Sequence, residues 1–271
     1  MRPEDVINLD AYPIQDPASP ARAEIVARLK RELDANQYVS LPDFIRPAAL
    51  ERAVADAKAA RVNAHHNKSR RNCYLHRKGD PSLPEDHPQN LMMDASTRMI
   101  AYDLIPQDSP VKTLYHWDIA RSFIADIVGA ERLYDNEDPC QPVNLLCYEN
   151  GDRSSWHFDS VNAFTMTLML QAPDAGGDFQ LVPNTRSDDD QNYDYVRKVV
   201  MGECPQDAVS VARHAGSLCI FRGCNSLHRV SEVKGDKMRI MGVFVYEFEP
   251  GVTGDPEVNA TIYGRESTAT M

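Results

Sequence analysis

The sequence lacks the features that mark membrane and secreted proteins. No run of apolar residues is long enough to span a bilayer, and no apolar segment near residue 1 resembles a signal peptide. None of the six cysteines stands in a Cys-x-x-Cys pair. Reduced thiols and a cytoplasmic location are therefore expected, because free cysteines are usual in reducing compartments.

Positive charge is also scarce relative to negative charge. Lysine and arginine total 29, aspartate and glutamate total 40, and the formal net charge is −11. This balance disfavours nucleic acids and anionic membranes as partners and leaves a small molecule as the expected one. The 271 residues are 42% hydrophobic and 25% charged, which suits a globular protein with a substantial core. We expect one domain over 1–271, and the sequence does not indicate its oligomeric state.

The first half of the chain carries helical patterns. Apolar residues at helical spacing, and one proline at a helix start, predict three helices, over 21–36, 47–61 and 111–128. A short strand is expected over 37–41, and a polar extended arm over 1–18. Segment 62–110 is rich in proline and charge and predicts a long, mostly irregular stretch with short strands. Such a stretch is either a lid over a binding site or a solvated connection.

From residue 143 onward, short apolar runs alternate with turn residues. They predict strands over 143–148, 164–171, 177–183, 209–213, 218–221, 228–233 and 238–248. One helix is expected over 188–201. Helices followed by many short strands indicate an α+β, mainly β fold, a jelly roll with N-terminal buttressing helices. We divide it into helical support with a lid segment (1–142), a jelly-roll core (143–250) and a C-terminal tail (251–271).

Two polar residues between the predicted strands 143–148 and 164–171 point to a metal site. His157 and Asp159 are separated by one residue, so on a strand both side chains face the same way. His228, at the start of a later strand, is the best candidate for a third ligand. Two histidines and one carboxylate form the facial set that holds non-haem Fe(II) and leaves coordination positions open. The alternative is a surface strand with two polar residues, because His-x-Asp is common by chance.

Arg239 strengthens the metal interpretation. It follows His228 by 11 residues, on the next predicted strand. A 2-oxo acid that chelates iron has a distal carboxylate, and in an apolar barrel this anion needs a fixed cation. The planar guanidinium of arginine offers two parallel hydrogen bonds to such a carboxylate. A surface arginine on a rim strand is the alternative.

Over 143–248 the sequence resembles the Fe(II)/2-oxoglutarate-dependent dioxygenase superfamily. The residues that carry the resemblance are Tyr148, His157, Asp159, Gly176, Gly177, Gly216, Phe221, His228, Arg229, Val230 and Arg239. The resemblance implies a double-stranded β-helix (cupin-like) fold, with Fe(II), 2-oxoglutarate and O2 as cofactor and co-substrates. It implies that His157, Asp159 and His228 bind iron and that Arg239 binds 2-oxoglutarate. Thr167 and Tyr148 are further candidates to contact 2-oxoglutarate, with ordinary packing as the alternative for both.

A closer resemblance is to the HalD/BesD-type group of free-amino-acid halogenases and their hydroxylase relatives. It is carried by four segments, 80–88, 103–106, 156–159 and 164–167. The halogenases resemble this chain but have a small residue where Asp159 stands, which frees an iron position for chloride. Because Asp159 keeps its carboxylate here, the resemblance implies a hydroxylase.

The expected function is hydroxylation of an unactivated C–H bond in a small molecule, a free amino acid or a derivative of one, with succinate and CO2 as co-products. Desaturation and oxidative cyclisation begin with the same hydrogen abstraction and remain alternatives. A non-catalytic cupin-like binding protein is a further one, and a zinc hydrolase would need a general base that is not evident. Substrate contacts are nominated at His76, Arg77, Asp86 and Glu149, because an amino acid needs a cation for its carboxylate and acceptors for its ammonium group.

Overall fold

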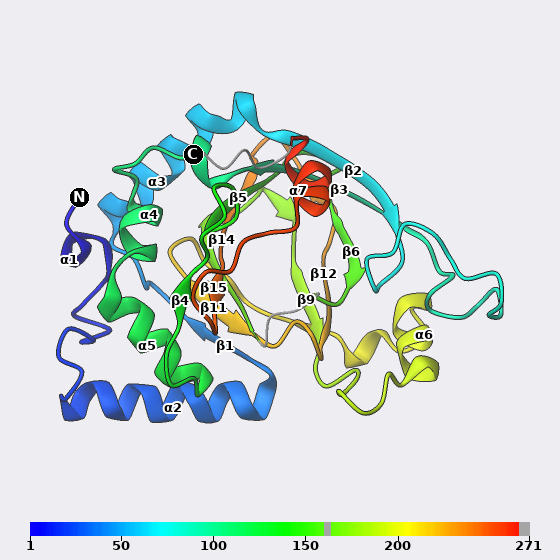
Figure 1. Ribbon diagram of the computed structural model, residues 1–271, viewed down its shortest axis with the longest axis horizontal. Helices are drawn as coiled ribbons and strands as arrows, with labels where there is room; N and C mark the ends of the chain where they lie inside the picture. The colour runs from blue at the N-terminus through cyan, green and yellow to red at the C-terminus, as the bar shows by residue number, and fades with distance from the viewer. Residues whose placement is uncertain (160–163, 266–271) are drawn as a thin grey trace.

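The computed structural model describes residues 1–159 and 164–265, and two antiparallel sheets form its centre (Figure 1). The strands of the larger sheet are β1 (Tyr38–Leu41), β2 (His65–Arg71), β3 (Met93–Ile100), β5 (Val143–Tyr148), β7 (Thr165–Gln171), β11 (Leu218–Phe221) and β14 (Arg239–Phe244). Their order is β1-β11-β7-β14-β5-β3-β2. The smaller sheet has the order β10-β9-β12-β6. Its strands are β6 (Ser154–His157), β9 (Phe179–Val182), β10 (Val209–Ser210) and β12 (Leu227–Val230).

Short strands complete the β structure at the margins. They form two separate two-stranded pairs, β4 (Tyr134–Asp135) with β15 (Tyr246–Glu247), and β8 (Ala175–Gly176) with β13 (Val233–Lys234). Glycine is needed at Gly176, where φ is +64° and an added Cβ would lie 2.0 Å from the Glu232 carbonyl oxygen.

Side-chain alternation gives the larger sheet two different faces. In β7, Met166, Leu168 and Leu170 belong to the main hydrophobic core. The intervening Thr167 lies opposite Cys219 of β11, in register, and faces the interior between the two sheets. A second apolar cluster lines that interior and includes Tyr148, Phe179 and Phe221. Strands β5, β7 and β11 thus separate the main core from the interior between the two sheets.

Helices α1 to α5 cover the core face of the larger sheet. The helix bounds are α1 (Pro3–Val6), α2 (Pro20–Asn36), α3 (Pro47–Ala60), α4 (Pro110–Tyr115), α5 (Asp118–Val128), α6 (Tyr193–Met201) and α7 (Pro256–Tyr263), with short 3-10 helices at Arg61–Asn63, Tyr102–Leu104 and Pro205–Asp207. Helices α1 to α5 gather on one side of the sheets (Figure 1). Proline at the first turn starts four of these five, and the Ser19 hydroxyl caps α2 by accepting from the Arg22 amide. The double-stranded β-helix with N-terminal buttressing helices is confirmed.

The helix predicted over 111–128 is wrong in one respect, because two helices occupy this range. Helix α4 ends at Tyr115, and Trp117 has an extended backbone (φ −81°, ψ 108°) that breaks the helix before α5. Tyr115 is buried and stacks on Tyr246 with ring centroids 4.7 Å apart. Packing of this aromatic pair decides the local geometry, and helical spacing alone does not reveal it.

Segment 62–110 is also more regular than expected. Strands β2 and β3 pair along their length, from His65 opposite Met99 to Arg71 opposite Met93, and extend the larger sheet. The sequence of β2 does not predict this pairing, because polar residues on both faces leave no apolar alternation. The irregular part is the connection 72–92, which projects from the sheet toward α6 (Figure 1).

Both chain ends differ from the expected arm and tail. Residues 1–18 include α1, and Ile7 forms a β-bridge with Ile45, so this segment is packed rather than extended. The expected tail contains α7, whose Tyr263 is buried beside Ala101 and Cys140. Residues 266–271 lie outside the described residues. Among the helices that the structure describes, none combines the length and apolar character needed to cross a membrane.

Candidate active site

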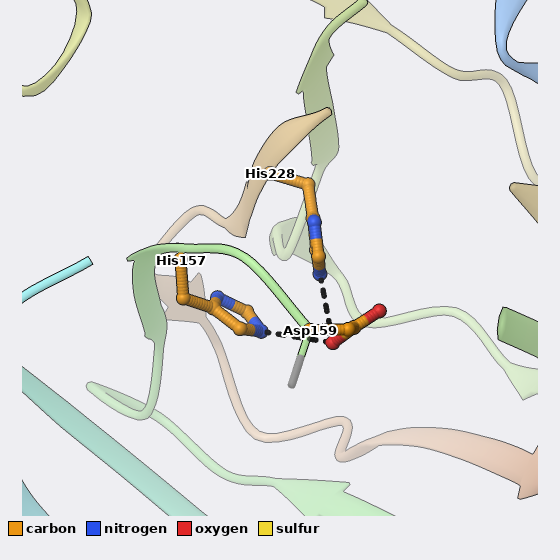
Figure 2. Close-up of side chains that lie close together, drawn as sticks. All are labelled: His157, Asp159 and His228. Atoms are coloured by element: carbon orange, nitrogen blue, oxygen red, sulfur yellow. Dashed lines mark ion pairs between the residues drawn. The ribbon is translucent and has the colours of Figure 1, made fainter. Parts of the chain in front are cut away.

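Three predicted ligands meet at the end of the smaller sheet. His157 ends β6 and stands opposite His228 of β12 in register, while Asp159 follows two residues later. The ligand atoms of these three residues all lie within 4.8 Å of one another. One oxygen of Asp159 is 3.5 Å from His228 Nε2 and 3.9 Å from His157 Nε2 (Figure 2). The side chains therefore surround one point, as three ligands of one metal ion would.

The two imidazoles are oriented by their own backbone. The Nδ1 atom of His157 donates to the Ser155 carbonyl at 2.8 Å, and that of His228 donates to the Ser226 carbonyl at 3.0 Å. A carbonyl oxygen can only accept, so the proton stands on Nδ1 and the Nε2 lone pair faces the common point. Such a hydrogen bond fixes both the tautomer and the ring orientation of a metal-binding histidine.

Electrostatics favours the ligand forms of these side chains. Burial, with further contributions from His228 and Arg71, lowers the pKa of His157 to about 3, so its imidazole is neutral at pH 7. Burial alone would raise the pKa of Asp159, but the adjacent His228 and His157 and the Thr165 hydroxyl lower it below its usual value. A neutral imidazole and an ionised carboxylate are the forms that bind metal.

The donor set fits a divalent transition metal such as Fe(II). Two imidazole nitrogens and one carboxylate oxygen are the ligands of a facial triad, which fills one side of an octahedral ion. His157 and Asp159 are half-buried and His228 is buried, so the site lies near an opening of the barrel. The opposite side of the ion would remain available for co-substrates.

Arg239 lies in the interior, as the spacing predicts. It begins β14 opposite Tyr148, is only 1% exposed, and places its guanidinium 5.1 Å from the Tyr148 ring centroid. Its Nε donates to the Gly177 carbonyl at 3.0 Å. Burial lowers the pKa of Arg239 to about 10. Within the described residues this guanidinium forms no ion pair. A buried cation without an anionic partner is unfavourable, so this position favours binding of an anion.

A second interior arginine, Arg213, is not among the site residues that the sequence predicted. Its Nη1 donates to Thr167 Oγ1 at 3.1 Å, and its Nη2 lies 3.3 Å from Cys219 Sγ. The guanidinium lies over the Phe179 ring, 3.7 Å from the centroid. Its charge also lowers the pKa of Arg239, so the two cations are close. Arg213 was expected at the end of a strand, but it stands after β10 in a connecting loop, where no spacing rule identifies it.

The other co-substrate candidates are gathered at these arginines. Thr167 contacts Arg213, and Tyr148 lies beside Arg239. Burial is the main cause that raises the pKa of the Tyr148 hydroxyl, so it stays protonated and can act as a donor. These residues form one polar cluster within the apolar interior.

The nominated substrate contacts are not gathered at the metal ligands. His76, Arg77 and Asp86 are exposed residues of the 72–92 connection. The Glu149 carboxylate accepts from Arg61 at 2.7 Å and pairs with Arg98 at 3.1 Å. Its charge is therefore already neutralised by two partners.

Arg71, the last residue of β2, is a further site residue that sequence reasoning missed. It is half-buried, and its buried Nε has no hydrogen-bond partner among the described residues. Burial lowers the pKa of Arg71, and the charges of Tyr148, Arg77 and Asp159 also act on it, which places it beside the metal ligands. The signal was present as the pair Arg70-Arg71, because alternation along a strand turns one of the two inward.

Comparisons with known proteins agree with this geometry. The family model described as halogenase D matches residues 21–257. The search of curated proteins found no match to this sequence.

Many solved structures share the fold, and three serve as examples. A 2OG-Fe(II) family oxidoreductase from Burkholderia pseudomallei is 16% identical, with a TM-score of 0.52 over 84% of this chain and 92% of its own. The α-ketoglutarate-dependent epimerase SnoN from nogalamycin biosynthesis is 15% identical, with a TM-score of 0.55 over 92% and 96%. The carbocyclase SnoK from the same biosynthesis is 15% identical, with a TM-score of 0.53 over 81% and 83%. At these identities the likeness establishes a shared fold.

The family match spans most of the chain, and the fold, the triad geometry and the earlier resemblance all agree with it. This protein belongs to the halogenase D family and has the fold of Fe(II)/2-oxoglutarate-dependent oxygenases.

Proposed function

We propose that this chain is a hydroxylase that uses Fe(II) and 2-oxoglutarate to oxidise an unactivated C–H bond of a small molecule, a free amino acid or a derivative of one. When bound, iron and 2-oxoglutarate supply the oxidising chemistry: O2 is consumed, 2-oxoglutarate becomes succinate and CO2, and the substrate carbon gains a hydroxyl group. The chain's own residues bind, orient and shield these reactants.

The observation that carries the proposal is the carboxylate of Asp159. One of its oxygens faces the Nε2 atoms of both histidines, at 3.5 and 3.9 Å. A halogenase of this family needs that position for chloride. Because a charged ligand is already there, chloride would have to displace it, and hydroxylation is the outcome that the donor set favours.

The two interior arginines support binding of 2-oxoglutarate. Arg239 and Arg213 are close together and form no ion pair within the described part of the chain. A buried cation without a partner is unfavourable, and a bound dicarboxylate relieves this. The Tyr148 and Thr167 hydroxyls lie beside these cations and can complete the hydrogen bonds to the distal carboxylate.

Arg71 supports a substrate with a carboxylate. Its guanidinium lies beside the metal ligands and has an unsatisfied Nε. The backbone beyond it is held near the site, because the Phe158 amide donates to the Cys73 carbonyl at 2.9 Å. Arg77 and His76 follow on the 72–92 connection and are positioned to contact a bound molecule only if that connection moves toward the site. Glu149 already has two cationic partners and is the weakest of the nominated contacts.

A substrate-triggered assay tests the proposal. Fe(II), ascorbate, 2-oxoglutarate and O2 are supplied with each of a panel of free amino acids, and succinate is measured with mass spectrometry of the product. We expect at least one amino acid to stimulate succinate formation and to gain one oxygen atom. A loss of two hydrogens would favour desaturation or oxidative cyclisation instead.

A binding experiment separates the oxygenase from a non-catalytic cupin-like protein. Fe(II) and 2-oxoglutarate are added together without O2, and the visible charge-transfer band of the chelate is sought. No band, together with no succinate for any amino acid tested, would rule out the oxygenase interpretation.

A further inference from the structure

The two oxygens of the Asp159 carboxylate have different surroundings. Oδ1 faces the imidazoles, whereas Oδ2 accepts a hydrogen bond from the Thr165 hydroxyl. Figure 2 shows the same division, with one oxygen turned to the histidines and the other turned away. Thr165 begins β7, on the same face as Thr167. The strand that provides part of the 2-oxo acid pocket therefore also contacts the metal ligand.

Gly223 lies against the same oxygen, Oδ2, that accepts from Thr165. Its carbonyl accepts the Asp159 amide at 3.1 Å. A Cβ at residue 223 would lie 1.9 Å from Asp159 Oδ2 and 3.1 Å from His228 Cε1. Its φ lies outside the left-handed range, so the absence of a side chain provides space rather than backbone freedom. Any larger residue at this position would push the carboxylate out of place.

These contacts bear on how many metal positions the carboxylate fills. A carboxylate can bind a metal through one oxygen or through both. With one oxygen, a facial triad leaves three positions, two for a chelating 2-oxo acid and one for O2. With both oxygens, the carboxylate would take the position that O2 needs. A charge-assisted hydrogen bond from Thr165 to Oδ2 favours the first arrangement.

We propose that Thr165 and Gly223 are positioning residues that keep Asp159 a one-oxygen ligand and so preserve the coordination position for O2. This inference rests on the proposed function, because it assigns the triad to a metal. It adds a determinant of reactivity that lies outside the ligand set. Residues that hold metal ligands in this way typically change metal affinity or activity about 10- to 100-fold when replaced.

Co(II) tests the proposal without requiring turnover. The ion binds the same kinds of ligand, and its visible absorption reports coordination number. The Thr165→Val and Thr165→Ser variants are loaded with Co(II) and 2-oxoglutarate without O2. We expect Thr165→Val to change the Co(II) spectrum and Thr165→Ser to restore the parent spectrum. Thr113→Val, which removes a hydroxyl in α4 far from the site, is the matched control and should leave the spectrum unchanged.

A double-variant comparison shows whether Thr165 acts through Asp159. We expect Thr165→Val to change Co(II) affinity in the parent protein, and to have no further effect in the Asp159→Ala background. An unchanged spectrum and affinity in Thr165→Val, or an equal change in the Asp159→Ala background, would overturn the proposal. If Thr165→Val does not fold, Thr165→Ala serves the same comparison.

Gly223→Ala tests the steric part separately. We expect its Co(II) affinity to fall by about 10- to 100-fold, because the added methyl group displaces the carboxylate. Parent affinity in a folded Gly223→Ala protein would contradict this role. Neither Co(II) readout depends on a substrate, so failure to find an amino-acid substrate would leave this proposal and its test intact.

Discussion

At residue 159 a carboxylate, rather than a small side chain, faces the two imidazoles of the site. Under the proposed function, this single residue decides between hydroxylation and halogenation. Its ionised form is favoured by His228, His157 and Thr165, and its geometry is limited by Gly223. Residue identity could be read from the sequence, but the contacts that hold the carboxylate could not, because they come from Thr165 at the start of β7 and from Gly223 in the turn between β11 and β12.

Replacing this residue should abolish hydroxylation. We expect Asp159→Gly to lower hydroxylation by more than about 100-fold, because a direct ligand is lost rather than one of its supporting contacts. Product is measured by mass spectrometry with chloride present, and any chlorinated product would support the family relationship. Asp189→Gly, at an exposed aspartate, is the control. Hydroxylation at the parent rate in Asp159→Gly would refute the ligand role.

The two interior arginines, Arg239 and Arg213, give a second prediction at the scale of single residues. We expect Arg213→Met to weaken 2-oxoglutarate binding by about 10- to 100-fold, since a hydrogen bond to a charged group contributes about 1.5–3 kcal/mol. Isothermal titration of the Co(II)-loaded protein measures this affinity. Without 2-oxoglutarate the variant should be no less stable than the parent, because it removes a cation that has no acidic partner among the described residues. Unchanged affinity with a large loss of stability would show that Arg213 is only structural.

At the scale of elements, the β2–β3 hairpin brings a cation to the site. Arg71 ends β2 and turns inward, whereas its neighbour Arg70 is exposed. Both residues were visible in the sequence as part of a basic segment. Their separate roles depend on the register with β3, which a polar strand without apolar alternation does not reveal.

The hairpin gives a prediction with a matched control. We expect Arg71→Met to raise the KM for the amino-acid substrate by about 10- to 100-fold, because a charge-assisted hydrogen bond to its carboxylate is lost. The affinity for 2-oxoglutarate should stay within about twofold. Arg70→Met should change neither quantity. Steady-state kinetics with the substrate and with 2-oxoglutarate varied in turn would show equal effects of both variants if Arg71 has no role in binding.

Elements with strong local patterns were predicted closely, and those determined by tertiary packing were not. The apolar strands β5 and β11 have the predicted bounds, and α2 begins one residue early, at Pro20. The break between α4 and α5 depends on burial of Tyr115 against Tyr246, which are distant in sequence. Asp255 caps the start of helix α7. This capping residue could be read from the sequence, but the polar residues around it did not indicate a helix.

At the scale of the whole molecule, the two sheets join residues from five strands into one site. The three residues of the triad come from β6, from β12 and from the segment that follows β6, while β5, β7 and β14 carry the residues proposed to bind the 2-oxo acid. The order of His157, Asp159, His228 and Arg239 in the chain predicted this convergence. Arg213 was not assigned beforehand because a loop residue carries no periodic signal, and Arg71 was not assigned because the register of β2 decides which of Arg70 and Arg71 turns inward.

Binding of metal and 2-oxoglutarate should stabilise the whole fold. At 100 times the Kd, a ligand that binds only the native state adds about 2.7 kcal/mol, which for a chain of this size corresponds to a rise in Tm of roughly 5–10 °C. Differential scanning calorimetry of the chelator-treated protein, before and after addition of Co(II) and 2-oxoglutarate, measures the rise. Arg239→Met should respond to Co(II) alone but gain little from 2-oxoglutarate. A full response in that variant would place the distal carboxylate elsewhere.

The central claim is that a carboxylate at residue 159 makes this member of the halogenase D family a hydroxylase. The most direct test is mass spectrometry of the product that the parent enzyme forms from its best amino-acid substrate, in buffers with and without chloride. We predict the same product in both buffers, with one added oxygen and no chlorine. A chlorinated product from the parent enzyme would contradict the account.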